Sequence, residues 1–294
     1  MIFSGMYLPL IVMCGFIVGV VINLIADYLP AQRHYHLAST SPFVSRSAVP
    51  PQPAFFPRHT DAHGQKHIWA VPLWSAVIAA LMHVPVYEPQ KRARHILTEL
   101  GLASAVTWIF YTFSDVPNWP ILMFYAAVLT LVVIIDVEYR WVFSEIILVA
   151  GLVAIFEAIF IPRVDLGESL RGGVYGLGVM IALYVMGIVF ARLIGILTGR
   201  RVGRTVLGFG DVYIGMLGGV ILGWSALWFA LLIMILTGAI ASLAFVTVKI
   251  VKTGRYRVFS AIPYGPYIVI GIATMLYVPQ VVGLPLARLL HVPF

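Results

Sequence analysis

The sequence predicts an all-α fold: a polytopic helical membrane bundle of about eight transmembrane helices, with the N-terminus outside. Of its 294 residues, 61% are hydrophobic and only 11% are charged, whereas soluble domains are roughly 45–50% apolar and about 25% charged. Long apolar runs recur through nearly the whole chain, while a membrane β-barrel would show short alternating segments. The net charge of +7 is typical of cytoplasmic loops rich in Lys and Arg, so no nucleic-acid partner is expected.

The apolar runs give the order of the expected spans. The first, Met6–Ala26, precedes a polar stretch rich in Pro, Ser and His, Ala31–His67, which lacks the apolar periodicity of a packed domain. Trp69–Met82 is shorter than the roughly 20 residues that a span needs, so we expect it to be re-entrant or interfacial. The other spans are expected at Ile96–Phe113, Ile121–Ile135, Val142–Ile161, Gly173–Ile196, Val212–Leu222, Ala226–Val248 and Ile262–Tyr277.

Basic residues between the spans orient the chain in the membrane. Ala31–Arg94 carries seven Lys or Arg residues, Leu197–Thr205 three and Lys249–Arg257 four, and the positive-inside rule places all of these segments in the cytoplasm. Asp136 then lies at the cytoplasmic end of one span, in a short turn to Trp141, and Asp211 at the cytoplasmic start of another. Two carboxylates distant in sequence are therefore expected at one membrane depth.

Such a pair of carboxylates is compatible with three kinds of site. Ionisable residues at this depth are costly and usually face the bundle interior or a water-filled cavity. Asp136 and Asp211 are therefore polar helix ends facing headgroups, a cation site of a carrier or channel, or the dyad of an aspartyl hydrolase. In a hydrolase, the ionised member takes a proton from the attacking water and the protonated member donates to the carbonyl oxygen. Gly208 and Gly210 would allow a tight turn and the close approach of a substrate strand.

Six segments resemble the prepilin peptidase family of intramembrane aspartic proteases, in the order of that family. LGFGDVYIGMLGGVILGW (Leu207–Trp224) is similar to its Gly-x-Gly-Asp segment, and VVIIDVEYR (Val132–Arg140) to the segment of its first catalytic aspartate. The others are GFIVGVVINLIADYLP (Gly15–Pro30), AVPLWSAV (Ala70–Val77), HILTELGLA (His95–Ala103) and IPYGPYIVIG (Ile262–Gly271).

The resemblance implies that residues 96–294 form a transmembrane aspartyl peptidase core. Residues 1–95 would supply the first transmembrane helix and a cytoplasmic loop with the short re-entrant or interfacial segment. Asp136 and Asp211 would be catalytic and face the cytoplasm at the inner (plasma) membrane. The substrate would be a type IV prepilin or a type II secretion pseudopilin, whose short basic leader is removed. Residues expected to bind substrate or support the site are Gly208, Gly210, Pro263, Gly265, Pro266, Glu99 and Asn23.

Several of these supporting residues have a structural alternative. Pro263 and Pro266 flank Gly265 and would break a helix, either exposing backbone groups to an extended substrate or only kinking the chain. Glu99 opens a span, so it either lines the active-site cavity or is a charge at a helix N-terminus. Asn23, late in the first span, is expected to hydrogen-bond across helices.

The chain departs from the family pattern in three places. Val142–Ser144 stands where Leu-Pro-Asp or Leu-Pro-Asn is usual, Tyr213 replaces a usual lysine, and the first loop has no Cys-x-x-Cys pairs. Proteolysis needs no cofactor, and S-adenosylmethionine enters only if the chain also N-methylates the new terminus, which the sequence does not support. The altered sequence after Asp136 leaves a catalytically degenerate assembly homologue as an alternative.

Three histidines in the first loop provide the alternative of a metal site. His59, His63 and His67 are spaced four apart, where cysteines lie in other family members. On a helix they would share one face and could bind zinc, but Gly64 interrupts such a helix. A solvated polar loop without metal is therefore the expectation.

Overall fold

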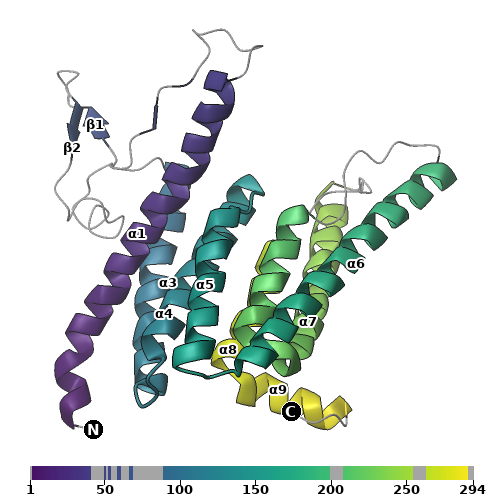
Figure 1. Ribbon diagram of the computed structural model, residues 1–294. Coiled ribbons are helices and arrows are strands. Elements are labelled where there is room, and N and C mark those ends of the chain that lie inside the picture. Colours follow the sequence, from purple (N-terminus) through teal and green to yellow (C-terminus); the bar gives the residue numbers. More distant parts are fainter. Residues whose placement is uncertain are drawn as a thin grey trace. The chain divides into compact units, whose positions relative to one another are not determined.

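The computed structural model describes residues 2–40, 50, 52–53, 58–60, 66–68, 89–198, 208–253 and 263–290. These residues are helical apart from short connections and one small β-hairpin, so the predicted polytopic helical fold class is confirmed (Figure 1). The chain divides into two compact units, Met1–Ile135 and Asp136–Phe294. The functional division after residue 95 stays a prediction.

The first unit is built on the packing of one long helix against another. Its elements are α1 (Ile2–Thr40), β1 (Arg58–Thr60), β2 (Lys66–Ile68), α3 (Pro89–Phe113) and α4 (Trp119–Tyr139) as far as Ile135. A Cβ at Gly19 of α1 would lie 2.6 Å from the Cα of Glu99 in α3, so the two backbones are in direct contact there. Small residues allow membrane helices this close approach.

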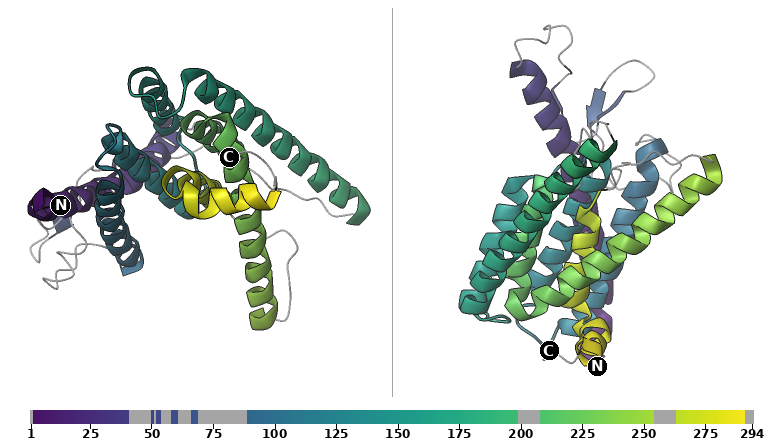
Figure 2. Two further views of the ribbon diagram at one scale, coloured as in Figure 1. Left: turned by 90° about the horizontal axis from the view of Figure 1, so that it is seen from below. Right: turned by 90° about the vertical axis from the view of Figure 1, so that its right-hand side faces the viewer.

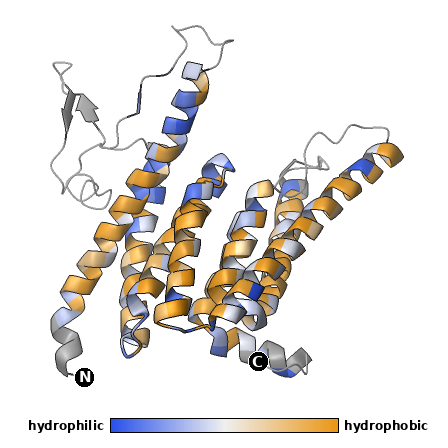
Figure 3. Cartoon of the chain, in the orientation of Figure 1, coloured by the Kyte–Doolittle hydropathy of each residue, from blue (hydrophilic) through white to orange (hydrophobic). Residues whose placement is uncertain are grey.

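Helix α1 extends well beyond the span expected from its apolar run. The helix has 39 residues and is about 58 Å long at 1.5 Å per residue, whereas the hydrocarbon core of a bilayer is about 30 Å thick. The expectation of a loop beginning at Ala31 was wrong as far as Thr40, because residues 31–40 contain neither Gly nor Pro to end the helix. Figure 3 shows the polar character of this end of α1. The basic residues Lys91, Arg92 and Arg94 likewise lie within α3 and not before it.

The second unit contains the last turn of α4 and five further helices. These are α5 (Ser144–Phe160), α6 (Leu166–Thr198), α7 (Phe209–Thr253), α8 (Gly265–Tyr277) and α9 (Pro279–Leu290). The last of them was not expected, because its short sequence is interrupted by Gly283 and Pro285 and is much shorter than a span. Within this unit, α7 contacts α5, α6 and α8, and Figure 2 shows its C-terminal half projecting from the other helices.

Helix α7 is divided at Gly223 into two arms. Gly223 has φ 77° and ψ 173°, a conformation that is essentially restricted to glycine. A side chain there would also meet Val164, since a Cβ would lie 2.7 Å from its Cγ1. The predicted break between the spans Val212–Leu222 and Ala226–Val248 is therefore confirmed, and both arms extend to the same side of it (Figures 1 and 2).

Glycines bring α6 and the first arm of α7 into backbone contact. Gly172 and Gly219 leave no room for a side chain, since a Cβ on either would collide with the backbone of the other. One turn further along, a Cβ at Gly176 would lie 2.5 Å from the carbonyl oxygen of Gly215. Each helix thus presents small residues four apart, the spacing by which membrane helices approach one another. This contact explains the glycine-rich sequence that follows Asp211.

Five of the described helices are long and apolar enough to cross a membrane: α1, α3, α4, α6 and α7. Helix α8 is apolar but shorter. With α7 counted as two arms and with α5 and α8 included, each of the eight expected spans corresponds to a helix or an arm of one. Large apolar side chains are exposed along these helices, for example Val174 at 69% and Ile196 at 79%, as expected for surfaces in contact with lipid. The protein is a multi-pass membrane protein.

Candidate active site

Asp211 lies in the first turn of α7, where the chain turns back on itself. Its carboxylate oxygen Oδ2 accepts a hydrogen bond from the backbone N–H of Gly208 at 2.9 Å, and its own N–H donates to the Gly208 carbonyl at 3.1 Å. The first bond is the half of a capping box in which a carboxylate accepts from the N–H three residues before it, and Gly208 has no side chain for the other half. Both amide groups of the helix start are thus bonded. Asp211 is only 6% exposed. The Gly-x-Gly-Asp turn therefore holds this carboxylate in one orientation inside the unit.

The two glycines of the turn have different surroundings. A Cβ at Gly210 would lie 2.6 Å from Cγ2 of Val142, so Gly210 allows the connection between α4 and α5 to pack against the start of α7. Gly208 is exposed, and its nearest neighbour would be the Asp211 carboxylate at 3.5 Å. Gly210 thus contacts Val142, one of the residues that departs from the family pattern. The close approach of a substrate strand at these glycines stays a prediction.

Asp136 lies in the last turn of α4 and not in the loop that was expected to begin there. The helix continues to Tyr139, and its end is marked by Arg140, whose φ of 55° is in the left-handed region. Glycine is usual at this position of a helix end. Asp136 is 6% exposed, and the charge of Arg140 acts on its carboxylate. The side chain of Glu138, two residues later, is exposed.

The first residue of α8, Gly265, lies directly against the side chain of Asp136. A Cβ at Gly265 would lie 2.5 Å from Oδ2 of Asp136, so any larger residue here would displace the carboxylate, and the N–H of Gly265 also lies beside it. Pro266 occupies the first turn of α8 and Pro263 precedes the helix. The expectation that these prolines break a helix was wrong, because proline at a helix start has no N–H bond to lose. They mark the beginning of α8.

Asp136 and Asp211 face the same region of the second unit. The charge of Asp136 acts on the carboxylate of Asp211, although 74 residues lie between them in the sequence. Oδ2 of Asp136 is buried without a hydrogen-bond partner among the described residues. Because buried polar atoms are nearly always bonded, this oxygen marks a position for water or a substrate group. The site thus combines two buried carboxylates with the starts of α7 and α8.

Tyr213 packs as part of an aromatic cluster at the start of α7. Its ring lies edge-on to Phe209 with 5.3 Å between centroids, and Phe209 lies edge-on to Tyr184 of α6 at 5.7 Å. Edge-to-face pairs at such distances stabilise packing beyond the area that they bury. The tyrosine that replaces the usual lysine therefore helps to fix the helix that carries Asp211 against α6.

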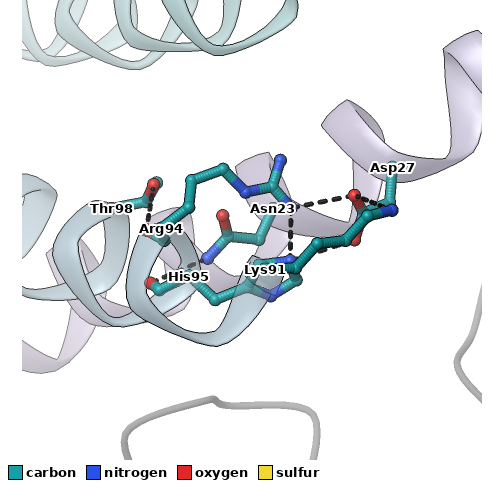
Figure 4. Close-up of polar contacts among 6 residues, drawn as sticks. All are labelled: Asn23, Asp27, Lys91, Arg94, His95 and Thr98. Carbon is teal, nitrogen blue, oxygen red and sulfur yellow. Dashed lines mark hydrogen bonds and ion pairs between the residues drawn. The ribbon is translucent and has the colours of Figure 1, made fainter. Parts of the chain in front are cut away.

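Asn23 of α1 and Glu99 of α3 lie in the first unit, where these two helices pack together. Figure 4 shows Asn23 beside His95. Asn23 is 1% exposed and donates a hydrogen bond from Nδ2 to the carbonyl of His95 at 3.0 Å, so the expected bond across helices is confirmed. Glu99 is fully buried, three turns into α3 and not at its start. The interpretation of Glu99 as a helix-terminal charge was therefore wrong.

Asp27 forms an ion cluster beside Asn23 that was not expected. Its Oδ1 is 2.8 Å from Nη2 of Arg94 and 3.3 Å from Nζ of Lys91, and its Oδ2 is 3.0 Å from Nε2 of His95 (Figure 4). The spacing of Lys91, Arg94 and His95 by three and four places these side chains on one face of a helix. This pattern is visible in the sequence, but it becomes informative only once α3 is known to begin before Lys91.

The loop histidines do not share a helix face. His59 and His67 lie on β1 and β2, which pair antiparallel with these two residues opposite each other. His63 lies outside the described residues, as does Trp69–Met82, the segment expected to be re-entrant. Within the described part of the chain, no group of three His, Cys, Asp or Glu residues could hold a metal ion.

A comparison with protein-family models matches residues 123–243 to the type IV leader peptidase family. The match includes Asp136, Asp211, Gly208 and Gly210, whereas Pro263, Gly265 and Pro266 follow it. No curated protein and no solved structure matches the chain. The match agrees with the family predicted from the sequence segments. Residues 123–243, the part of the chain that carries both aspartates, are therefore similar to the type IV leader peptidase family, a family of proteases.

Proposed function

We propose that this protein is an intramembrane aspartic endopeptidase that removes the short basic leader from a type IV prepilin or pseudopilin. The observation that carries the proposal is a pair of buried aspartates, Asp136 at the end of α4 and Asp211 at the start of α7, with the charge of one acting on the other. Such a pair suits water activation, because two carboxylates that share a site can hold one proton between them.

In the proposed reaction, the ionised carboxylate of the pair takes a proton from a water molecule as that water attacks the scissile carbonyl carbon. The protonated carboxylate donates its proton to the carbonyl oxygen, giving a tetrahedral intermediate. As this collapses, the carboxyl group that took the proton from water gives it to the leaving amine, and the other carboxylate recovers its proton from the hydroxyl of the intermediate. The unbonded Oδ2 of Asp136 provides a place for the water or the carbonyl oxygen. The glycine at 265 keeps this oxygen free of side-chain atoms.

The membrane orientation also belongs to the proposal. The positive-inside rule puts both aspartates at the cytoplasmic face of the inner membrane. A pilin precursor with its hydrophobic helix in the membrane and its leader in the cytosol would present its scissile bond at that face. A carrier or channel would instead need acidic residues near the bilayer midplane, at the ends of paired half-helices. Methylation of the new terminus is not part of the proposed function.

The test is cleavage of a purified prepilin by the full-length protein in detergent or liposomes, with both termini of the products read by mass spectrometry. Asp136→Asn and Asp211→Asn should each abolish cleavage, and Glu138→Gln, the matched change at an exposed carboxylate of the same helix end, should not. Cleavage by either aspartate variant would overturn the dyad. Intact prepilin with the wild-type protein would favour the degenerate homologue. Parallel reactions with S-adenosylmethionine would reveal any methylation.

A further inference from the structure

The short connection between α4 and α5 begins beside Asp136. It consists of residues 140–143, which lie between the two helices. Its first residue, Arg140, is in the left-handed region and still donates its N–H to the carbonyl of Asp136 at 2.9 Å. Its last residue, Phe143, is extended, with φ −87° and ψ 116°. The path of the connection is therefore tied at its start to the backbone of Asp136.

An aromatic pair flanks Val142 within this connection. The rings of Trp141 and Phe143, the residues before and after it, lie edge-on to each other with 6.5 Å between centroids. Edge-to-face pairs of this kind stabilise packing beyond the area that they bury. All three side chains are half-buried. Val142 is thus held by an ordered segment of chain, although it lies outside the helices.

Val142 lies directly against Gly210, the residue before Asp211. A Cβ at Gly210 would lie 2.6 Å from Cγ2 of Val142 and 2.7 Å from its Cβ, whereas carbon atoms in contact are about 3.5–4.0 Å apart. The second distance joins two atoms that are each fixed to a backbone, so rotation of the valine side chain cannot lengthen it. The valine therefore packs on bare backbone, and it limits how near the Gly-x-Gly-Asp turn can come to the connection.

This contact joins the two aspartates by a short path through the protein. Val142 follows Asp136 by six residues (142 − 136 = 6), and Gly210 is bonded directly to Asp211. Helix α5, which follows the connection, also packs on α7. The connection therefore cannot withdraw from the start of α7 unless this helix moves with it.

We propose that Val142 is a positioning residue of the aspartate pair, whose side chain, packed on Gly210, sets the distance between the carboxylates of Asp136 and Asp211. The two positions are complementary in size, since the side chain at 142 fills the space that the absent side chain at 210 leaves. This inference rests on the proposed peptidase function for its kinetic consequences.

Exchanging the bulk at the two positions tests the contact in prepilin cleavage. Gly210→Ala should lower kcat about a hundredfold, because the added carbon pushes the turn by about 1 Å, with KM changed less than about twofold. Val142→Gly, which removes both contacting carbons, should recover about tenfold or more of this loss in the Gly210→Ala background. Val137→Ala is the control at the same end of α4, since Val137 is 53% exposed, and should leave both constants unchanged. A double variant as slow as Gly210→Ala would overturn the inference and leave the proposed function intact.

A measurement that needs no proteolysis separates the two proposals. Infrared titration of the carboxyl groups, with each aspartate assigned by its Asn variant, shows how strongly one carboxylate affects the other. Asp136→Asn should change the titration of Asp211, on which its charge acts. The change should be smaller in the Gly210→Ala protein, because the interaction of two charges weakens with their separation, and Val142→Gly should restore it.

The neighbouring charges are the same throughout this comparison. Arg140 acts on Asp136, and Asp211 acts on Tyr264, and both neighbours are retained in every variant. The Gly210→Ala measurement needs no change at position 142, so it decides the question even where Val142→Gly fails to accumulate. An equal effect of Asp136→Asn with and without Gly210→Ala would overturn the inference. Failure of the wild-type protein to cleave any prepilin would by itself remove only the proposed function.

Discussion

Gly265 lies so close to Asp136 that a methyl group on its Cα would be 2.5 Å from the carboxylate oxygen Oδ2. The added atom would be fixed to the backbone at the start of α8, so the contact could be relieved only if the Asp136 side chain turned away or the backbone shifted. The contact therefore ties the beginning of α8 to the end of α4, within the second unit, at the position of the candidate dyad.

Gly265→Ala should consequently reduce prepilin cleavage about a hundredfold or more, because displacements near 1 Å at a reacting group cost that much. The protein should still accumulate in the membrane. Gly178→Ala is the control, since a Cβ at Gly178 meets nothing within 4 Å. Initial cleavage rates of the two variants, normalised to protein amount, give the comparison. Equal rates would show that the Asp136 pocket tolerates the methyl group.

Gly219→Ala should destabilise the second unit by about 1–3 kcal/mol, the usual cost of overpacking. The added carbon would meet the backbone of Gly172 in α6, which cannot move aside as a flexible side chain can. Thermal unfolding in detergent measures the effect, with Gly151→Ala as the control because its surroundings are open. An unchanged unfolding temperature for Gly219→Ala would mean that α6 and α7 are not packed at these glycines.

Tyr213→Ala should lower the free energy of unfolding by about 1 kcal/mol, through loss of the edge-on contact with Phe209. Tyr213→Phe should be neutral, since this packing uses the ring and not the hydroxyl. The two variants are compared by unfolding temperature and by cleavage rate. If Tyr213→Phe were as damaging as Tyr213→Ala, the hydroxyl would have a role beyond the aromatic cluster.

Arg163→Met should destabilise the protein by about 3–5 kcal/mol, because it removes the cation that faces a buried carboxylate. Nε of Arg163 lies 3.1 Å from Oε1 of Glu157, which is 3% exposed, and Nη2 donates to the carbonyl of Ile221 at 2.7 Å. Adding Glu157→Gln should recover part of the loss, as measured by thermal unfolding of the single and double variants. A double variant less stable than Arg163→Met would contradict the charge explanation.

The helices and the candidate dyad were predictable because they follow from local composition and from charge counting. The division of α7 at Gly223 was visible as a short neutral stretch between two apolar runs. The positive-inside rule then assigned Asp136 and Asp211 to one face without any knowledge of their contacts.

Other features depend on packing and could not be read from the sequence. The length of an apolar run shows which part of a helix can contact lipid, but it does not show where the helix ends. The end of α1 at Thr40, beyond its apolar run, was therefore not predicted. Gly210 gives no sign in sequence that its close neighbour is Val142, and Tyr264 none that its ring rests on Gly238. The interpretation of Glu99 as a helix-terminal charge was wrong because the start of α3 was placed several residues too late. Its role in lining the active-site cavity stays a prediction.

The break at Gly223 has a consequence for how the chain tolerates insertions. Each residue turns a helix by about 100° and advances it by about 1.5 Å. The number of residues between Asp211 and Gly223 therefore sets the direction in which the Asp211 carboxylate points from the first arm. One residue added between Asp211 and Gly223 would rotate the carboxylate by about 100° from Asp136. Four added residues would nearly restore its direction but displace it by about 6 Å. An insertion or deletion in the first arm is thus expected to be as damaging to the site as a substitution of Asp211 itself.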